Sequence, residues 1–394
     1  MNGESRGSAK SFSRILQGVI DFGAPNTSSQ PLHVLGVIPG EGIGPEVIQA
    51  SLEVLSAIQL VTGRQFEIVK GGAIGFESEA RGEEPLSQSI EEFCRDIFSR
   101  RGAVLCGPGG GRFVYALRKK FDLFCKMIPL IPFSALRNTG PMRTRYTKQV
   151  DILIVRDNAE GIYQGSWRET SNAGNRRVAE HTFAYSEGQV LRILTVAARL
   201  ASARSGKMTV VLKDAGIPTI SQLWRDCANS VSLREGVDCA FMNVDYATYA
   251  LLQKANEFDV VVTSNLFGDI LADASALLLG SRALSYSGNF SANGSAVYQT
   301  NHGAAFDLQG LNVANPVGQI LSLAMLLRES YGLHRESNLI RKAVTKVWKD
   351  GWRTADLANR DSRIMGTSEI TALIVQAIFS LSTSNLLRTK NRSA

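Results

Sequence analysis

The stretch His33-Val-Leu-Gly-Val-Ile-Pro-Gly-Glu-Gly-Ile-Gly-Pro-Glu46 sets a pattern that the rest of the chain repeats. It predicts a short apolar strand, a glycine turn and a helix that continues through residues 47–58. Similar strands are predicted at residues 102–106, 151–155, 208–212 and 259–263, and helices at 90–101, 187–205, 221–230 and 246–255. Continuous β-branched strands that alternate with helices indicate an α/β protein with a largely parallel sheet.

The glycine turn does not have the usual dinucleotide-binding spacing. Gly40, Gly42 and Gly44 alternate with other residues, whereas a Rossmann fold carries Gly-x-Gly-x-x-Gly. A second cluster, Gly109-Gly-Gly111, also exposes backbone N–H groups in a tight turn. Either turn could face a phosphate or simply connect a strand to a helix. The sequence therefore predicts a fold that is α/β but not Rossmann.

Length and composition indicate a protein with a large core. The chain has 394 residues, of which 44% are hydrophobic and 20% charged, and it is long enough for two domains. No apolar run approaches the roughly 18 residues of a membrane helix, so we expect no membrane partner. The net charge of +7 comes from Lys and Arg spread along the chain. This distribution favours small anionic ligands over nucleic acid.

Cysteine and histidine usage argues against several kinds of site. The five cysteines form no Cys-x-x-Cys pair, which disfavours a disulfide framework or structural zinc and favours a reducing, cytoplasmic location. The four histidines lack metal-binding spacing. Residues 1–30 are rich in Ser, Gly and Asn, and we expect a disordered extension, with organellar targeting left open. Catalysis should therefore rest on carboxylates, Lys, Tyr and Arg.

Two aspartates interrupt the apolar segment Asn265-Leu-Phe-Gly-Asp269-Ile-Leu-Ala-Asp273. On a helix, residues four apart face the same way, with Cβ atoms about 5–6 Å apart. If the helix is buried, two such anions need a compensating positive charge, for which a divalent cation is a candidate. Alternatively, both lie on the solvated face of an amphipathic helix. The segment alone leaves both interpretations open.

Five motifs, in the same order, resemble those of the β-decarboxylating dehydrogenases, which include isopropylmalate, isocitrate, homoisocitrate and tartrate dehydrogenases. They are Pro39-Gly-Glu-Gly-Ile-Gly-Pro-Glu46, Ala116-Leu-Arg-Lys-Lys-Phe-Asp-Leu-Phe124, Ile154-Val-Arg-Asp-Asn-Ala-Glu-Gly-Ile-Tyr163, Val261-Val-Thr-Ser-Asn-Leu-Phe-Gly-Asp-Ile-Leu-Ala-Asp273 and His302-Gly-Ala-Ala-Phe-Asp307. The resemblance implies an isopropylmalate dehydrogenase-like fold of two domains. Residues 31–123 and 280–390 would form a large cofactor-binding domain, and residues 124–279 a small domain with the dimer interface and most catalytic residues.

The resemblance also implies metal ligands and proton-transfer groups. Asp269 and Asp273 match two metal ligands, and Asp245 matches a third that comes from the partner subunit. This arrangement implies a homodimer with shared active sites, and such carboxylates suit Mg²⁺ or Mn²⁺. Lys213 matches the family's catalytic lysine, and Tyr163 matches its catalytic tyrosine.

The cofactor implied by the resemblance is NAD. His302 and Gly303 begin the cofactor motif, and Asp307 matches an acidic residue that binds the adenosine ribose. A carboxylate accepts hydrogen bonds from the 2′-hydroxyl of NAD but repels the 2′-phosphate of NADP. Asn315 matches a residue near the adenine.

The substrate site departs from the family pattern. Arg118 and Arg156 match two of three carboxylate-binding arginines, but relatives have Asn-x-Arg-Pro where this chain reads Lys126-Met-Ile128-Pro. Isoleucine cannot make the bidentate contacts of a guanidinium. Lys126 or Arg112 could approach a substrate carboxylate from another direction.

Neighbouring positions that set substrate specificity in relatives are also changed. Arg112, Val114 and Tyr115 replace both the Ser and Asn of the isocitrate type and the Glu and Leu pair of the isopropylmalate type. Near the cofactor, Ala215, Gln299 and Phe306 replace residues that are usual in the family.

These features together predict a metal-dependent, NAD-linked oxidative decarboxylation of a 3-substituted malate-type 2-hydroxy acid, and not of isocitrate. The alternatives are a non-catalytic regulatory paralogue, oxidation without decarboxylation, and a nucleic-acid-binding role that has only the net charge behind it.

Overall fold

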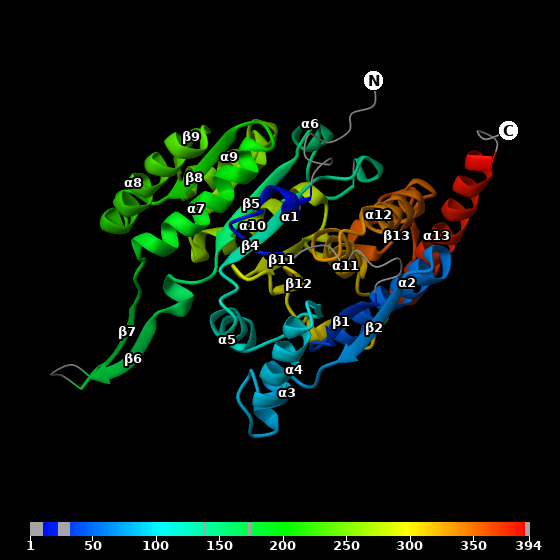
Figure 1. Ribbon diagram of the computed structural model, residues 1–394, viewed down its shortest axis with the longest axis horizontal. Helices are drawn as coiled ribbons and strands as arrows, with labels where there is room; N and C mark the ends of the chain where they lie inside the picture. The colour runs from blue at the N-terminus through cyan, green and yellow to red at the C-terminus, as the bar shows by residue number, and fades with distance from the viewer. Residues whose placement is uncertain (1–10, 23–31, 138, 172–174, 391–394) are drawn as a thin grey trace.

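A computed structural model describes residues 11–22, 32–137, 139–171 and 175–390. Its centre is one ten-stranded sheet (Figure 1). In spatial order the strands are β2 (Gln65–Lys70), β1 (Leu32–Ile38), β3 (Ala103–Cys106), β12 (Ala296–Thr300), β11 (Tyr286–Phe290), β4 (Cys125–Leu130), β5 (Ile152–Asp157), β10 (Val260–Thr263), β8 (Lys207–Leu212) and β9 (Asp238–Asn243). The strands β2, β1, β3 and β12 are mutually parallel, as are β5, β10, β8 and β9. Antiparallel pairs join the two groups through β11 and β4. The expectation of an α/β fold with a largely parallel sheet is confirmed.

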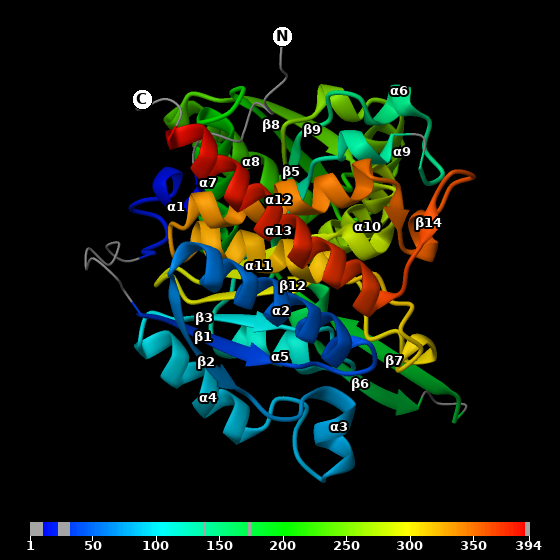
Figure 2. The same cartoon turned by 90° about the vertical axis from the view of Figure 1, so that its right-hand side faces the viewer.

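Helices cover the sheet in two groups. Helices α2, α11, α12 and α13 pack against one another near β1, whereas α7 lies on β5, β10 and β8 and α8 packs on α7 (Figure 2). The longer helices are α2 (Gly44–Thr62), α4 (Gln88–Ser99), α5 (Phe113–Lys120), α7 (Glu187–Ser202), α8 (Pro218–Glu235), α9 (Val244–Gln253), α10 (Asn265–Ser275), α11 (Val317–Glu329), α12 (His334–Lys349) and α13 (Thr367–Lys390). The shorter ones are α1 (Phe12–Ile15), α3 (Gly75–Ala80) and α6 (Thr144–Thr147). Among the residues described, no helix has both the length and the hydropathy needed to cross a bilayer.

Two small sheets complete the fold. Strands β6 (Ser166–Ser171) and β7 (Arg177–Thr182) form an antiparallel arm that projects from the body (Figure 1). Strands β13 (Trp352–Arg353) and β14 (Arg363–Ile364) form a short parallel pair.

The division into two domains that is expected from the sequence, at residues 123/124 and 279/280, falls between β11 and β4, inside the continuous sheet.

The two glycine turns are held together by one buried carboxylate. Glu41, which is 5% exposed, accepts hydrogen bonds from the N–H of Gly110 at 2.5 Å and of Glu77 at 2.8 Å. Gly42 has a φ of +58°, and a Cβ there would clash with the carbonyl oxygen of Ala304. The turn after β1 is therefore packed between the Gly109–Gly111 loop and the His302–Asp307 segment.

The expected disorder of residues 1–30 does not hold for residues 11–22. Leu16 and Ile20 are fully buried in the main core, and the N–H of Asp21 donates to the carbonyl oxygen of Ala292 at 2.9 Å. The side chains of Phe12, Leu16 and Ile20 recur every four residues, a helical spacing that the surrounding Ser and Gly obscured. Residues 1–10 and 23–30 lie outside the described residues.

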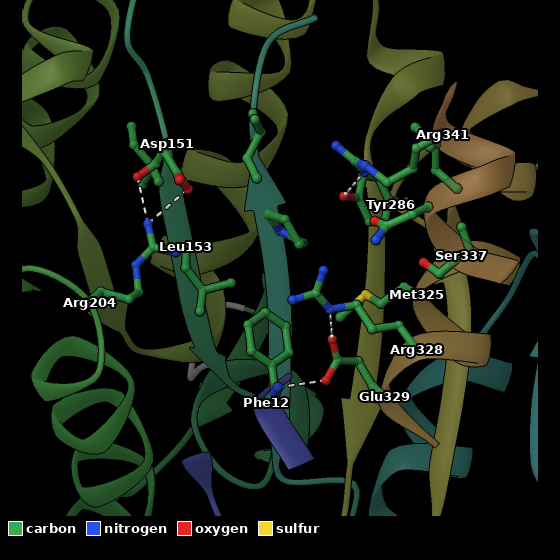
Figure 3. A pocket seen from close by; sticks show the side chains of 16 residues that line it. Phe12, Asp151, Leu153, Arg204, Tyr286, Met325, Arg328, Glu329, Ser337 and Arg341 are labelled. Atoms are coloured by element: carbon green, nitrogen blue, oxygen red, sulfur yellow. Dashed lines mark hydrogen bonds and ion pairs between the residues drawn. The ribbon is translucent and has the colours of Figure 1, made fainter. Parts of the chain in front are cut away.

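This N-terminal segment borders a cavity of about 100 Å³ (Figure 3). The N–H of Phe12 donates to Glu329 Oε2 at 2.6 Å, and Arg328 pairs with the same carboxylate. Pro129 and Leu153, a cross-strand pair of β4 and β5, line the cavity. Because side chains alternate along a strand, the cavity lies on the sheet face opposite to Lys126 and Arg156.

Burial raises the pKa of Glu329 from 4.5 to about 7, although Arg328 and the N–H of Phe12 oppose the shift. Because the folded state then binds the proton more tightly than the unfolded chain, this group's contribution is present below pH 4.5 and lost as the pH rises through 7. We expect Glu329→Gln to be more stable than the wild type near pH 8, by on the order of 2 kcal/mol, and the difference to vanish below about pH 4. Urea unfolding across this range measures it. The exposed Glu53→Gln is the control, and a difference that is constant with pH would contradict the expectation.

Candidate active site

The site is built around Arg156 at the end of β5. This side chain is 1% exposed, and its guanidinium donates to Asn265 Oδ1 at 2.8 Å and pairs with Asp269. A Cβ on Gly268 would lie 2.6 Å from Arg156 Cγ, so the glycine leaves the room that Arg156 needs to reach α10. The motif that contains the two aspartates and the motif that contains Arg156 therefore meet in space.

Two further cations are buried beside Arg156. Lys126 lies directly opposite it in the β4–β5 ladder and is 3% exposed, and Arg118 on α5 is 5% exposed. Burial, together with the charge of Arg156, lowers the pKa of Arg118 to about 9. Burial also lowers the pKa of Lys126 well below its usual value, assisted by Arg118 and Arg156. The three cations concentrate positive charge that the nearby carboxylates, Asp269 and more weakly Asp273, only partly offset.

Asp269 and Tyr163 form the polar centre of the site. Burial opposes ionisation of Asp269, but Arg156, Lys126 and a hydrogen bond from Tyr163 outweigh it and lower the pKa of the carboxyl. Burial, the charge of Asp269 and their hydrogen bond raise the pKa of the Tyr163 hydroxyl. The tyrosine thus stays protonated at neutral pH and is able to donate a proton.

Asp273 faces a different cation. Arg282 donates two hydrogen bonds to its carboxylate, at 2.6 and 3.1 Å. The side chains of Asp269 and Asp273 are each 42% exposed, so α10 presents two hard oxygen ligands to solvent. That donor type fits Mg²⁺ or Mn²⁺. Within the described part of the chain, no three His, Cys, Asp or Glu side chains converge at a metal-binding distance.

Lys213 and Asp245 form a separate pair. The Lys213 ammonium donates to Asp245 Oδ1 at 3.0 Å, and the Asp245 side chain is 68% exposed. The hydrogen bond from Lys213 lowers the pKa of Asp245. Within one chain there are therefore two separate groups of contacts. In one, Asp269 contacts Arg156 and Tyr163; in the other, Lys213 contacts Asp245.

The expected cofactor residues lie beside the aspartate helix. Asp273 and Arg282 are electrostatic neighbours of His302, whose Nε2 is buried without a hydrogen-bond partner among the described residues. Burial lowers the pKa of His302. Gly303 has open space around it, and Asp307 is exposed in the 3-10 turn Phe306–Leu308. This loop therefore has an orphaned buried nitrogen and an accessible carboxylate, which fit a polar cofactor.

The amide of Asn315 is already engaged within the chain. Its Nδ2 donates to Asp356 at 3.0 Å, and its Oδ1 accepts from the N–H of Val317 at the beginning of α11. The expected contact of Asn315 with an adenine stays a prediction.

The expected specificity residues of α5 wall one side of the site. Arg112 donates to the carbonyl oxygen of Tyr163 at 3.0 Å and lies over the rings of Trp167 and Tyr115, at 4.3 and 5.2 Å. The rings of Tyr115 and Tyr163 are 5.1 Å apart. Val114 is partly buried and packs against a second hydrophobic cluster, which includes Phe113 and Leu117. Arg112 thus holds the Tyr163 backbone, and its expected role as a substrate contact stays a prediction.

Sequence reasoning overlooked several partners. Asn265, Gly268 and Arg282 support the predicted aspartates and Arg156, and Trp167 comes from the exposed arm. Asn265 and Gly268 belong to the quoted motif, so their position was a usable signal. Nothing in the sequence pairs Arg282 with Asp273.

Known proteins are similar to this chain over most of its length. Residues 34–374 match the family model described as isocitrate/isopropylmalate dehydrogenase. The chain is 35% identical over 357 residues to a 3-isopropylmalate dehydrogenase of Halalkalibacterium halodurans, covering 87% of this chain and 97% of that protein. The corresponding enzyme of Geobacillus kaustophilus is 36% identical over 360 residues, covering 87% and 95%. A crystal structure of isocitrate dehydrogenase from Methylococcus capsulatus superposes with a TM-score of 0.78 at 28% identity, covering 88% of this chain and 99% of that one. The chain therefore belongs to the isocitrate/isopropylmalate dehydrogenase family.

Proposed function

We propose that this protein catalyses the metal-dependent, NAD-linked oxidation and decarboxylation of a 3-substituted malate-type 2-hydroxy acid. The observation that carries the proposal is the cluster of Arg118, Lys126 and Arg156, three buried cations next to Asp269 and Tyr163. Buried charges need compensation, and an anionic substrate would supply it. Relatives named 3-isopropylmalate dehydrogenase support a hydroxy-acid substrate.

In this mechanism Arg118 and Arg156 orient the substrate by its carboxylates. NAD⁺, when bound, would supply the acceptor for the hydride of the hydroxyl-bearing carbon, and Lys213 would act as the base that accepts the hydroxyl proton. The bond to the 3-carboxylate then breaks, CO₂ departs, and the electron pair remains as an enolate. Tyr163, held protonated beside Asp269, delivers a proton to the enolate carbon.

Asp269 and Asp273, with Asp245 of the partner subunit, would hold Mg²⁺ or Mn²⁺, which supplies Lewis-acid stabilisation of negative charge developing on the substrate oxygen. For the cofactor, His302, Gly303 and Asp307 would bind the adenosine part of NAD. The carboxylate of Asp307 favours NAD over NADP because it repels a 2′-phosphate.

A homodimer follows from the position of Lys213 and Asp245. These residues are joined at 3.0 Å, so we infer that they enter the site of a second copy as a unit. Exposed apolar side chains surround this region, with Tyr246 and Tyr249 on α9 and Ile270 on α10 between 49% and 58% exposed. Such a patch favours a protein partner.

The test is NAD reduction, with Mg²⁺ or Mn²⁺, against a panel of 3-substituted malates, with CO₂ release followed in parallel. We expect NADH and CO₂ in equal amounts, a strong preference over NADP, and loss of activity with a chelator. NADH without CO₂ would instead indicate oxidation alone. Absence of both turnover and NAD binding would favour a regulatory paralogue and overturn the proposal.

A further inference from the structure

Lys126 occupies a position that packing alone does not explain. The β4–β5 register pairs it with Arg156, and the β11–β4 register pairs it with Asn289. Cross-strand partners point to the same face of a sheet, so the ammonium lies on the face that carries Arg156. Placing a lysine there brings two like charges together in an almost fully buried setting.

The charges around Lys126 do not balance. Arg156 is satisfied by Asn265 and Asp269. Among the described residues, the Nε of Arg118 is buried without a hydrogen-bond partner. Asp269 and Asp273 act on the Lys126 ammonium as electrostatic neighbours, but their ion pairs within 4 Å are with Arg156 and Arg282. An uncompensated buried cation costs several kcal/mol in real proteins. Arg118 and Lys126 lie side by side and are incompletely compensated, which points to an anionic ligand that completes them.

We propose that Lys126 and Arg118 together bind a carboxylate of the substrate, so that the site takes a 2-hydroxy dicarboxylate even though Ile128 replaces an arginine. Ile128 is fully buried in the main core and pairs with Ile154, two positions along the β4–β5 ladder from Lys126. The ammonium of a lysine at position 126 lies beside Arg156, and the lysine side chain does not have to pass through the core to reach it. This inference rests on the proposed function and adds that the second substrate carboxylate is still recognised.

A lysine also recognises an anion differently from an arginine. Its ammonium is a compact point charge with three rotatable donors, whereas a guanidinium imposes a planar, two-point geometry. A carboxylate bound by Lys126 can therefore tilt as the substituent on the neighbouring carbon changes. We expect the site to accept several 3-substituents while still requiring both carboxylates.

The test compares Lys126→Met with the wild type, using succinate as a non-reacting dicarboxylate and butyrate as the monocarboxylate control. Loss of one charge-assisted hydrogen bond should weaken succinate binding about 10- to 100-fold in calorimetry and leave butyrate within about threefold. Lys126→Arg should retain most of the succinate binding. The matched control is Lys119→Met, which removes an exposed lysine one residue from Arg118.

Thermal unfolding separates recognition from a structural role. Because Lys126→Met removes an incompletely compensated buried cation, we expect the ligand-free variant to melt at the same or a higher temperature than the wild type. A lower melting temperature with unchanged succinate affinity would show that Lys126 serves the fold and would overturn the proposal. Equal losses for succinate and butyrate would overturn it as well.

A further test moves the cationic side chain along β4 from position 126 to position 128. Lys126→Asn should lose dicarboxylate binding, and the double variant Lys126→Asn/Ile128→Arg should regain it together with turnover of 3-isopropylmalate. Ile128→Arg alone adds a fourth buried cation and should unfold more easily. Because succinate binding is measured without turnover or NAD, its outcome is independent of whether the proposed dehydrogenase activity is found.

Discussion

Two inactive variants of this protein, Asp245→Asn and Asp269→Asn, should restore about a quarter of wild-type activity when they are co-expressed in one cell. In a shared-site dimer each active site takes Asp269 from one chain and Asp245 from the other. Random pairing gives half mixed dimers, and one of the two sites in each mixed dimer keeps both aspartates. Each variant alone should lose at least about 10³-fold in kcat, because each lacks a carboxylate where charge develops during the reaction.

The measurement is NAD reduction with the best substrate of the panel, first on the co-expressed mixture and then on the mixed dimer isolated with two affinity tags, which should show about half of wild-type activity. The pair Asp269→Asn and Asp273→Asn is the control, since both residues lie on α10 of one chain and their mixture should stay inactive. Restoration by the control pair, or none by the test pair, would refute the shared site. Because the assay needs a turned-over substrate, the activity of wild type is established first.

The largest effect on stability is expected for Arg204→Met. Arg204 donates to Asp151 Oδ1 at 2.8 Å and to Asp259 Oδ1 at 2.5 Å, and all three side chains are between 8% and 12% exposed. Burial opposes the charge, but Asp151 and Asp259 outweigh it and raise the pKa of Arg204. Removing the guanidinium leaves two buried carboxylates without their shared partner, which typically costs about 3–5 kcal/mol.

Urea unfolding at neutral pH measures the change in the free energy of unfolding for Arg204→Met. The control is Arg81→Met, which breaks an exposed pair with Glu77 one helical turn away and should cost less than about 0.5 kcal/mol. Asp151 and Asp259 immediately precede β5 and β10, whereas Arg156 lies near the opposite end of β5 and Asn265 comes after β10. Folded Arg204→Met should therefore retain its kcat, and a loss below about 1 kcal/mol would show that the network contributes little.

The strands that the sequence predicts are those with uninterrupted apolar, β-branched residues, such as β5, β8 and β10. Strand β4 escapes prediction because Lys126 and Pro129 interrupt its apolar pattern. Strand β6 is exposed along its whole length, and β7 has only two half-buried residues, Val178 and Glu180. In both cases tertiary context outweighs local preference: β4 is buried between two antiparallel neighbours, and the arm is stabilised by pairing with itself.

The features of the site likewise divide into those that the sequence predicts and those that it does not. The residue types of Asp269, Asp273 and Tyr163 are recognisable in local motifs, so their chemistry can be read from sequence. Their contacts depend on chain segments about a hundred residues apart, as with Arg156 and Asn265, and local patterns carry no such information. The unusual feature, a lysine facing Arg156, becomes visible only when the β4–β5 register is known.

The continuity of the sheet has a mechanical consequence. Strands β11 and β4 are joined by register pairs from Gly288–Met127 to Phe290–Cys125, and no linker separates the two halves of the chain at this point. Widening the space around Asp269 should therefore require a change of twist in this ladder rather than rotation about a flexible hinge. Lys126 belongs to that ladder. A substrate carboxylate bound by the Lys126 ammonium would exert its force on β4, the strand at which the two halves meet. Ligand affinity and the stiffness of the sheet would therefore be coupled at one residue.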